Sequence, residues 1–117
     1  MLLTINGKDY QLYFGLDFIS YLDKKYHVAQ NGFQLGQGLA YVSAQMELGN
    51  PLILVDLITA GTISGEKPKL EDIRKFIETE ADIEVLMNDF LSALKTTSST
   101  KLMMKRLGLL MGTENEK

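Results

Sequence analysis

Apolar and polar residues alternate at the start of the chain and then change to a helical spacing. Residues 3–5 and 10–14 are rich in β-branched, aromatic and other apolar side chains, and they flank Asn6-Gly7. Asn-Gly is the strongest short-range hairpin signal, because a type I′ turn needs a positive φ at both central residues. Gly15 then interrupts the pattern. The sequence therefore predicts a β-hairpin over residues 1–15.

Beyond this hairpin, apolar residues recur every three or four positions, the spacing of a helix with one buried face. Turn-forming residues at Asn31-Gly32, Gly49-Asn50-Pro51 and Ser64-Gly65 divide this part of the chain. Phe33 and Leu35 are expected in a short glycine-punctuated connector. The predicted helices cover residues 16–27, 37–48, 51–61, 69–79, 82–95 and 100–108.

These elements predict a mainly α (α+β) fold, with an N-terminal β-hairpin followed by a compact bundle of about five or six short helices. The segment 51–61 is apolar on nearly all sides, which places it in the core or in an interface. It also suits a buried strand, but Pro51 and the short flanking turns favour a helix. The length fits one domain over residues 1–117. Within it we expect residues 16–110 to be helical and residues 111–117 to form a disordered tail.

Charge is distributed unevenly along the chain. The net charge is −3, which disfavours nucleic-acid binding by phosphate neutralisation. Acidic residues concentrate in residues 71–90, whereas residues 101–106 contain Lys101, Lys105 and Arg106 and no acid. This asymmetry suits complementary contacts, including head-to-tail contacts between copies of the chain.

The composition also narrows the compartment and the chemistry. The chain has no cysteine, so neither a disulfide framework nor a thiolate site is expected. The first residues lack the pattern of a signal peptide, and the apolar stretch from Pro51 to Ile63 is shorter than a membrane span. We therefore expect a cytoplasmic protein without membrane contact.

Candidate catalytic and ligand-binding residues are sparse. His27 is the only histidine, so it has no second histidine or cysteine with which to form a triad or a metal site. The carboxylates within residues 78–84 lie on predicted solvent-exposed faces. Gly36-Gln37-Gly38 precedes a helix without the phosphate-loop pattern, and we interpret it as a connector that packs helices closely. The sequence thus predicts no catalytic, cofactor-binding or metal-binding residues and no small-molecule substrate.

The N-terminal hairpin is a candidate surface for self-association. A lone hairpin is marginal in water, and its unpaired edge is available for pairing with another copy. The residues expected at this surface are Leu3, Ile5, Tyr10, Leu12 and Phe14.

The methionine-rich C-terminal third is a candidate surface for other partners. Methionine side chains are flexible and adapt to irregular or varied apolar partners. Packing in the core of the chain is the alternative for these residues. The predicted partner-binding residues are Met103, Met104, Leu107 and Met111.

The order of several segments resembles the tail assembly chaperones of long-tailed phages and prophages of Gram-positive bacteria. The resemblance covers nearly all of residues 2–102, and its most specific pieces are NGK followed by FG, LDKKY, and the connector from NG to G-x-G-L. The similar segments are TINGKDYQLYFGLDFISYLDKKYHV, NGFQLGQGLAYV, LGNPLILVDLITAGT, KPKLEDIRKFIE, ADIEVLMNDFLSAL and TTSSTKL.

This resemblance implies a non-enzymatic assembly factor of the host cytoplasm that is absent from the finished virion. Such proteins bind the tape measure protein in many copies, help to recruit the tail tube protein, and are often also made in a longer frameshifted form. The resemblance implies a homo-oligomer without a cofactor. Two other hypotheses remain: a head–tail connector or completion protein retained in the virion, and a small nucleic-acid-binding regulator that uses residues 101–106.

Overall fold

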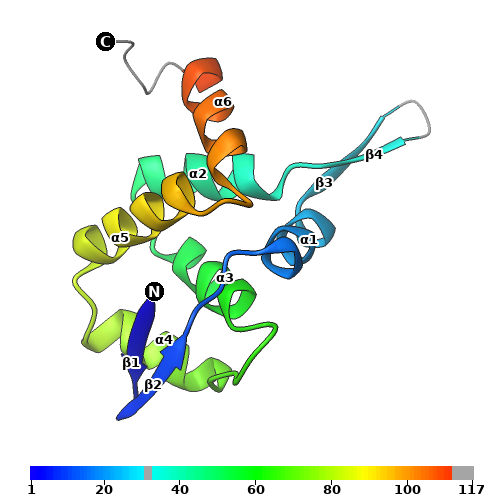
Figure 1. The fold of residues 1–117 in the computed structure, drawn as a ribbon. Coiled ribbons are helices and arrows are strands. Elements are labelled where there is room, and N and C mark those ends of the chain that lie inside the picture. Colours follow the sequence, from blue (N-terminus) through cyan, green and yellow to red (C-terminus); the bar gives the residue numbers. More distant parts are fainter. Residues whose placement is uncertain (31–32, 112–117) are drawn as a thin grey trace.

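The computed structural model describes residues 1–30 and 33–111, with side chains described for residues 1–27 and 37–108 (Figure 1). Strands β1 (Leu2–Ile5) and β2 (Lys8–Gln11) form an antiparallel hairpin. Between them, Asn6 has φ 53° and Gly7 has φ 75°, the positive values that a type I′ turn requires. The predicted N-terminal hairpin is confirmed.

The helical part also confirms the predicted fold class. Each helix lies within three residues of its predicted ends, and α3 is a helix rather than a buried strand. Gly49 follows α2 with φ 74°, the left-handed conformation expected of a glycine that ends a helix. The helices are α1 (Leu16–Lys25), α2 (Gly38–Leu48), α3 (Leu52–Gly61), α4 (Leu70–Thr79), α5 (Ile83–Thr96) and α6 (Lys101–Met111).

A second hairpin corrects the prediction that residues 16–110 are helical. Strands β3 (His27–Gln30) and β4 (Phe33–Gly36) pair antiparallel, with Val28 opposite Leu35, where the sequence predicted an irregular connector. The signal was present, because Asn31-Gly32 repeats the dipeptide of the first hairpin between apolar residues. Those two residues lie outside the described residues. The hairpin points away from the helical body (Figure 1).

The C-terminal end differs from the prediction at one residue. The predicted disordered tail, residues 111–117, begins inside α6, because Met111 is the last residue of that helix. The rest of the predicted tail lies outside the described residues. None of the helices in the described part is both long and apolar enough to cross a membrane.

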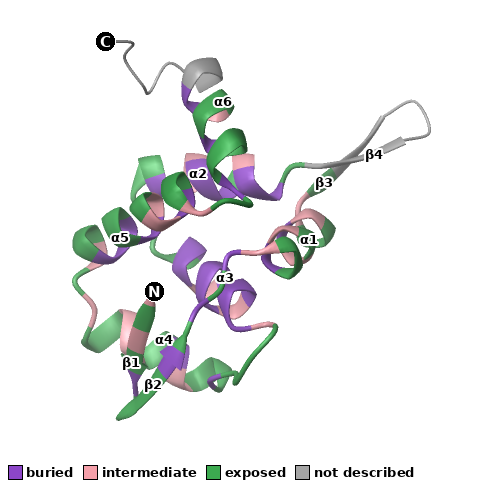
Figure 2. Cartoon of the chain, viewed as in Figure 1, coloured by how far each residue is buried: buried purple, intermediate pink, exposed green. Residues whose placement is uncertain are grey.

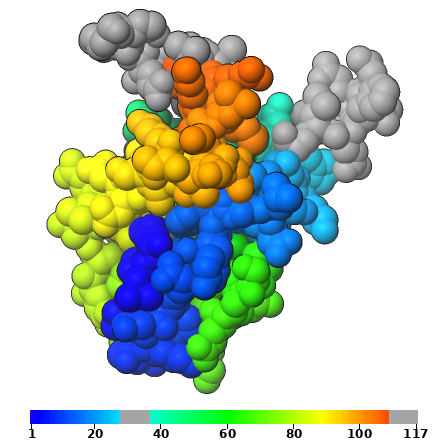
Figure 3. Space-filling view, viewed as in Figure 1, coloured from blue at the N-terminus to red at the C-terminus, as the bar shows by residue number. Residues whose placement is uncertain are grey.

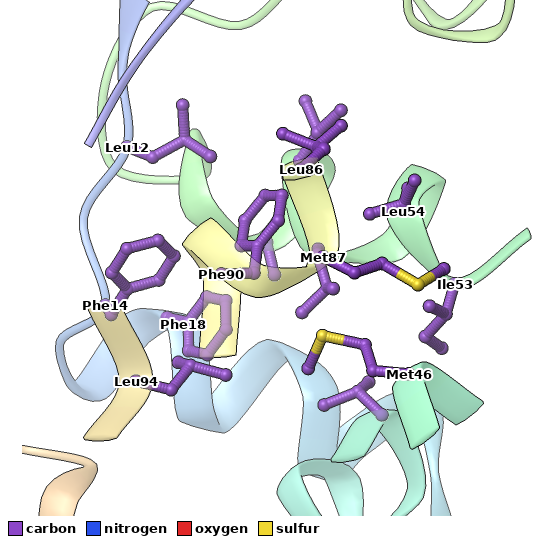
Figure 4. Packing of buried hydrophobic residues seen from close by; sticks show 14 of the residues in the cluster. Leu12, Phe14, Phe18, Met46, Ile53, Leu54, Leu86, Met87, Phe90 and Leu94 are labelled. Carbon is purple, nitrogen blue, oxygen red and sulfur yellow. The ribbon is translucent and has the colours of Figure 1, made fainter. Parts of the chain in front are cut away.

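The core forms where the first hairpin and α1 meet α3 and α5 (Figure 2). The rings of Phe14 and Phe18 pack edge to face with centroids 5.0 Å apart, and Phe14 contacts Phe90 of α5 in the same way at 5.9 Å (Figure 4). A Cβ at Gly61 of α3 would lie 3.0 Å from the Leu12 side chain, so this glycine lets the strand exit lie close against the helix. The hairpin is therefore part of the core.

Close packing of α1 on α2 explains one glycine of the connector. A Cβ on Gly38 would lie 2.5 Å from the backbone carbonyl carbon of Leu22. The Gly38 backbone N–H donates to Oδ1 of Asp23 at 2.9 Å, which holds the start of α2 against α1. The interpretation of this glycine as a point of close helix packing is confirmed.

Candidate protein-contact surfaces

The residues predicted for self-association lie mainly in the core of the chain itself. Ile5, Tyr10, Leu12 and Phe14 are buried, and Leu3 is half-buried against the same cluster. These side chains stabilise the hairpin on the helices. Their contribution to contacts between copies stays a prediction.

Two threonines, Thr97 and Thr100, stabilise the turn between α5 and α6. The Thr100 side chain is fully buried, and its hydroxyl donates to the carbonyl of Leu94 at 2.6 Å. The Thr97 hydroxyl donates to the carbonyl of Ala93, also at 2.6 Å. These bonds satisfy carbonyls in the last turn of α5, which have no partner within the helix. Helix α6 consequently stands at a defined angle on top of α2 and α5 (Figure 1).

The predicted partner-binding residues of α6 divide between two faces of the helix. Met104 is 4% exposed and its sulfur accepts from the Ser43 hydroxyl of α2 at 3.5 Å, while Leu107 is half-buried against the core. Met103, in contrast, is 39% exposed. Met111 ends α6, but its side chain lies outside the described residues. Of the described members, Met103 is therefore the most exposed, and the role of these residues in partner binding stays a prediction.

Sequence reasoning missed Leu102 as a neighbour of Met103. Leu102 is 55% exposed on α6. Residues Lys101, Lys105 and Arg106 are exposed as well, and α6 has no acidic residue. The outer surface of α6 is therefore apolar and cationic. Figure 3 shows this helix, in orange, at the surface of the molecule. The helical spacing of the sequence could have indicated this exposure. Positions 102 and 106 share one face of a helix, and position 104 lies on the opposite face, so a buried Met104 leaves Leu102 exposed.

A second surface lies between the α2–α3 turn and the α4–α5 turn, and sequence reasoning missed it. Its larger hollow has a volume of about 470 Å³ and its smaller hollow about 110 Å³. We call both together the corner furrow. The larger hollow is lined by Met46, Glu47, Gly49, Ile83, Glu84, Met87, Asn88 and Leu91. The smaller hollow is lined by Pro51, Leu52, Val55, Arg74, Ile77 and Glu78.

The larger hollow of the corner furrow combines an apolar floor with an acidic rim. Met46 and Met87 are buried at its floor, where Figure 4 shows their side chains close to each other. Glu47 and Glu84 are exposed at the edge of the larger hollow. In the smaller hollow, Leu52 is 66% exposed. An apolar groove of this kind suits the apolar face of a helix.

A buried carboxylate lies in a third hollow of about 340 Å³ between α1, α3 and the segment before α4. Asp56 is 8% exposed; Lys25 Nζ lies 2.7 Å from its Oδ1, and the Tyr26 hydroxyl donates to its Oδ2. Burial of the ring and the hydrogen bond to Asp56 raise the pKa of Tyr26 above its ordinary value. The hydrogen bond to Asp56 also raises the pKa of Lys25. The carboxylate is thus paired on both oxygens and holds α1 to α3.

The remaining titratable residues of the described ranges form one further ion pair, between Lys8 at the first hairpin and Glu66 before α4. His27 is exposed, and its Nδ1 lies 3.1 Å from the carbonyl oxygen of Lys24. Asp82 caps α5 by accepting from the Val85 backbone N–H at 3.2 Å. Across the described ranges, no group of three or more histidine, cysteine or acidic residues could hold a metal ion.

Comparison with protein families gives one match. A family model described as "Phage tail assembly chaperone protein, TAC" matches residues 2–108. The match covers both hairpins, α1 to α5 and most of α6. No curated protein and no solved structure matches the chain.

Proposed function

Because the chain belongs to the phage tail assembly chaperone (TAC) family, we propose that it is a non-enzymatic chaperone that binds the tape measure protein during tail assembly. In this role it also helps to recruit the tail tube protein. The family match over residues 2–108 is the observation that carries the proposal. The host cytoplasm is the proposed location, and the finished virion is not expected to contain the chain.

Two surfaces of the structure support a role in binding proteins. The outer surface of α6 exposes Leu102 and Met103, and the corner furrow is apolar at its floor. Exposed apolar surfaces of this kind mark protein contacts, and amphipathic helices commonly bind in apolar grooves. A long, helix-rich client offers many similar stripes, so weak contacts from many copies add up while each stays reversible.

Co-expression with the long coil-rich protein encoded downstream tests the proposal. The tagged chain is purified by affinity chromatography in moderate salt, and the client is also expressed alone as the control. We expect several copies of the chain to co-purify with the client and to keep it soluble. A client that precipitates equally with and without the chain contradicts the proposal.

Mass spectrometry of purified virions separates the chaperone from a connector. A chaperone is expected in infected cells and absent from virions, whereas a connector or completion protein is retained in them. Detection of the chain in virions at a constant copy number would favour the connector.

A further inference from the structure

We propose that the groove between α3 and α4 binds a helix of the client, one whose apolar stripe is flanked by acidic residues. The inference rests on the proposed function, because it names the surface and the side-chain chemistry by which the chain would hold its client. The variants described below distinguish a wrong surface from a wrong function.

Two of the hollows described above join where α3 packs against α4 (Figure 1). The third hollow and the smaller hollow of the corner furrow share one lining residue, Val55. Leu52 and Ile77 line the smaller hollow, at the start of α3 and the end of α4. Thr59 and Leu70 line the third hollow, at the opposite ends of the same helices. The two helices therefore run in opposite directions past each other, and we call the joined hollows the α3–α4 groove.

The α3–α4 groove has the length and the walls that suit a helix. From Leu52 to Thr59, α3 rises by seven residues or about 10 Å, which corresponds to two turns of a partner helix. The residues that line the groove follow helical spacing on both walls, at positions 52, 55 and 59 of α3 and positions 70, 73, 74 and 77 of α4. An extended strand would need unpaired backbone groups, which the interior of a helix does not offer. The groove therefore suits a helix rather than a strand.

Apolar side chains stay open to solvent at both ends of the α3–α4 groove. Leu52 is 66% exposed and Leu70 is 57% exposed, and each is the first residue of its helix. Between them, Val55 and Ile77 are half-buried against the core. Exposed apolar residues that gather in one hollow mark a contact site. The apolar stripe of an amphipathic helix would cover these side chains.

The charged side chains of the α3–α4 groove indicate the flanks of that helix. Lys25 is paired with Asp56. The other charged lining residues are Lys67, Arg74 and Glu78, and no ion pair within the described ranges includes any of them. Two cations and one anion are thus left to a partner, although the whole chain has a net charge of −3. Acidic residues beside the apolar stripe are the complementary chemistry.

The same charges argue against another copy's α6 as the occupant. The outer surface of α6 is cationic, with Lys105 and Arg106 exposed and no acidic residue in the helix. It would place these cations against Lys67 and Arg74, and like charges placed opposite each other destabilise a contact. The groove is consequently assigned to the client.

A substitution at the exposed end of the groove tests the apolar contact, with the client that co-purifies with each tagged full-length variant measured after co-expression. We expect Leu52→Asp to reduce the co-purified client at least about tenfold, because a carboxylate replaces an apolar side chain within the contact. Leu16→Asp is the matched control, since Leu16 is 77% exposed, also begins a helix and does not line the groove. It is expected to leave the co-purified client unchanged.

Charge reversal tests the acidic flank of the client. Lys67→Glu with Arg74→Glu is expected to reduce the co-purified client at least about fivefold in low salt. Lys75→Glu with Lys95→Glu is the matched control, because it changes the net charge equally and both lysines are exposed outside the groove. We expect this control to retain the client as the wild type does.

A single introduced cysteine identifies the occupant directly. The chain has no cysteine, so Leu52→Cys provides one site for a benzophenone label, which crosslinks on illumination to the molecule that lies in the groove. Mass spectrometry of the co-purified complex should locate the crosslink in client segments that combine an apolar stripe with acidic residues. Leu16→Cys, labelled in the same way, is the control and is expected to give few crosslinks to the client.

Three outcomes would overturn the proposal. Crosslinks from Leu52→Cys that reach only other copies of the chain, or only client segments without acidic residues, assign the groove to a different occupant. Full co-purification of the client by Leu52→Asp and by the reversed Lys67 and Arg74 variant leaves the chaperone function standing but locates the client on another surface. A wild-type chain that does not bind the client at all overturns the groove and the proposed function together.

Discussion

The ring of Tyr26 stacks on the ring of Tyr41, with centroids 4.0 Å apart and planes inclined by 19°, while its hydroxyl donates to the buried Asp56. Tyr26 lies between α1 and β3, and its carbonyl accepts from the Gln37 backbone N–H at 2.9 Å. One residue thus ties the base of the second hairpin to α2 through Tyr41 and to α3 through Asp56.

Removing the Tyr26 hydroxyl should weaken this junction without removing the ring. We expect Tyr26→Phe to lower the free energy of unfolding by about 1–3 kcal/mol, because a buried carboxylate loses a hydrogen-bond donor. Urea denaturation measures the change. Tyr13→Phe is the control: this tyrosine is 54% exposed, and a change within about 0.5 kcal/mol is expected. Equal effects of the two substitutions would contradict the role given to Asp56.

Alkaline pH should act on the same junction. The folded chain raises the pKa of Tyr26, so this hydroxyl keeps its proton to a higher pH in the folded state than in the unfolded state. Above the ordinary tyrosine pKa of about 10, the folded state therefore binds more protons, and stability falls as pH rises. The raised pKa of Lys25 acts in the same direction. Urea denaturation between pH 8 and 11 should show a steeper loss for wild type than for Tyr26→Phe, and equal slopes would count against the prediction.

Close packing at Gly38 predicts a large effect of one added methyl group. In Gly38→Ala, the new Cβ would lie 2.5 Å from the backbone of Leu22, so α1 and α2 must move apart. We expect a loss of about 1–3 kcal/mol in the free energy of unfolding. The control is Gly15→Ala, because a Cβ there meets no atom within 4 Å. Chemical denaturation of both variants checks the difference, and a neutral Gly38→Ala would show that the helices adjust freely.

The hydrogen bond from the Thr100 hydroxyl to the Leu94 carbonyl is expected to stabilise α6 on the helical body. Thr100→Val keeps the shape of the side chain but leaves the buried carbonyl of Leu94 without this donor. We expect a loss of about 1–3 kcal/mol in global stability and faster hydrogen exchange in α6. Thr96→Val is the comparison, since its hydroxyl bond to the Ser92 carbonyl lies at an exposed position where water competes. Unchanged exchange in α6 would mean that Met104 and Leu107 alone hold the helix.

The sequence by itself determined the local elements. Asn6-Gly7 fixes the first turn because both residues adopt positive φ, Gly49 ends α2 for the same reason, and Asp82 begins α5 as its cap. Asn31-Gly32 is also a hairpin signal in the sequence. The predicted helix over residues 16–27 included His27, the first residue of β3, and the second hairpin was therefore not predicted. These features depend on neighbouring residues, so the sequence is sufficient to predict them.

Only the tertiary structure decided which apolar residues face outward. Met103 and Met104 are neighbours in the chain, yet one is exposed and the other packs on Ser43. Leu12 belongs to a pattern that also suits an open sheet surface, but α3 covers it. The corner furrow joins the α2–α3 turn to the α4–α5 turn, which are distant in sequence. Hydrophobic spacing predicts that a helix has a buried face, but the packing of distant segments determines what covers that face and what stays open to a partner.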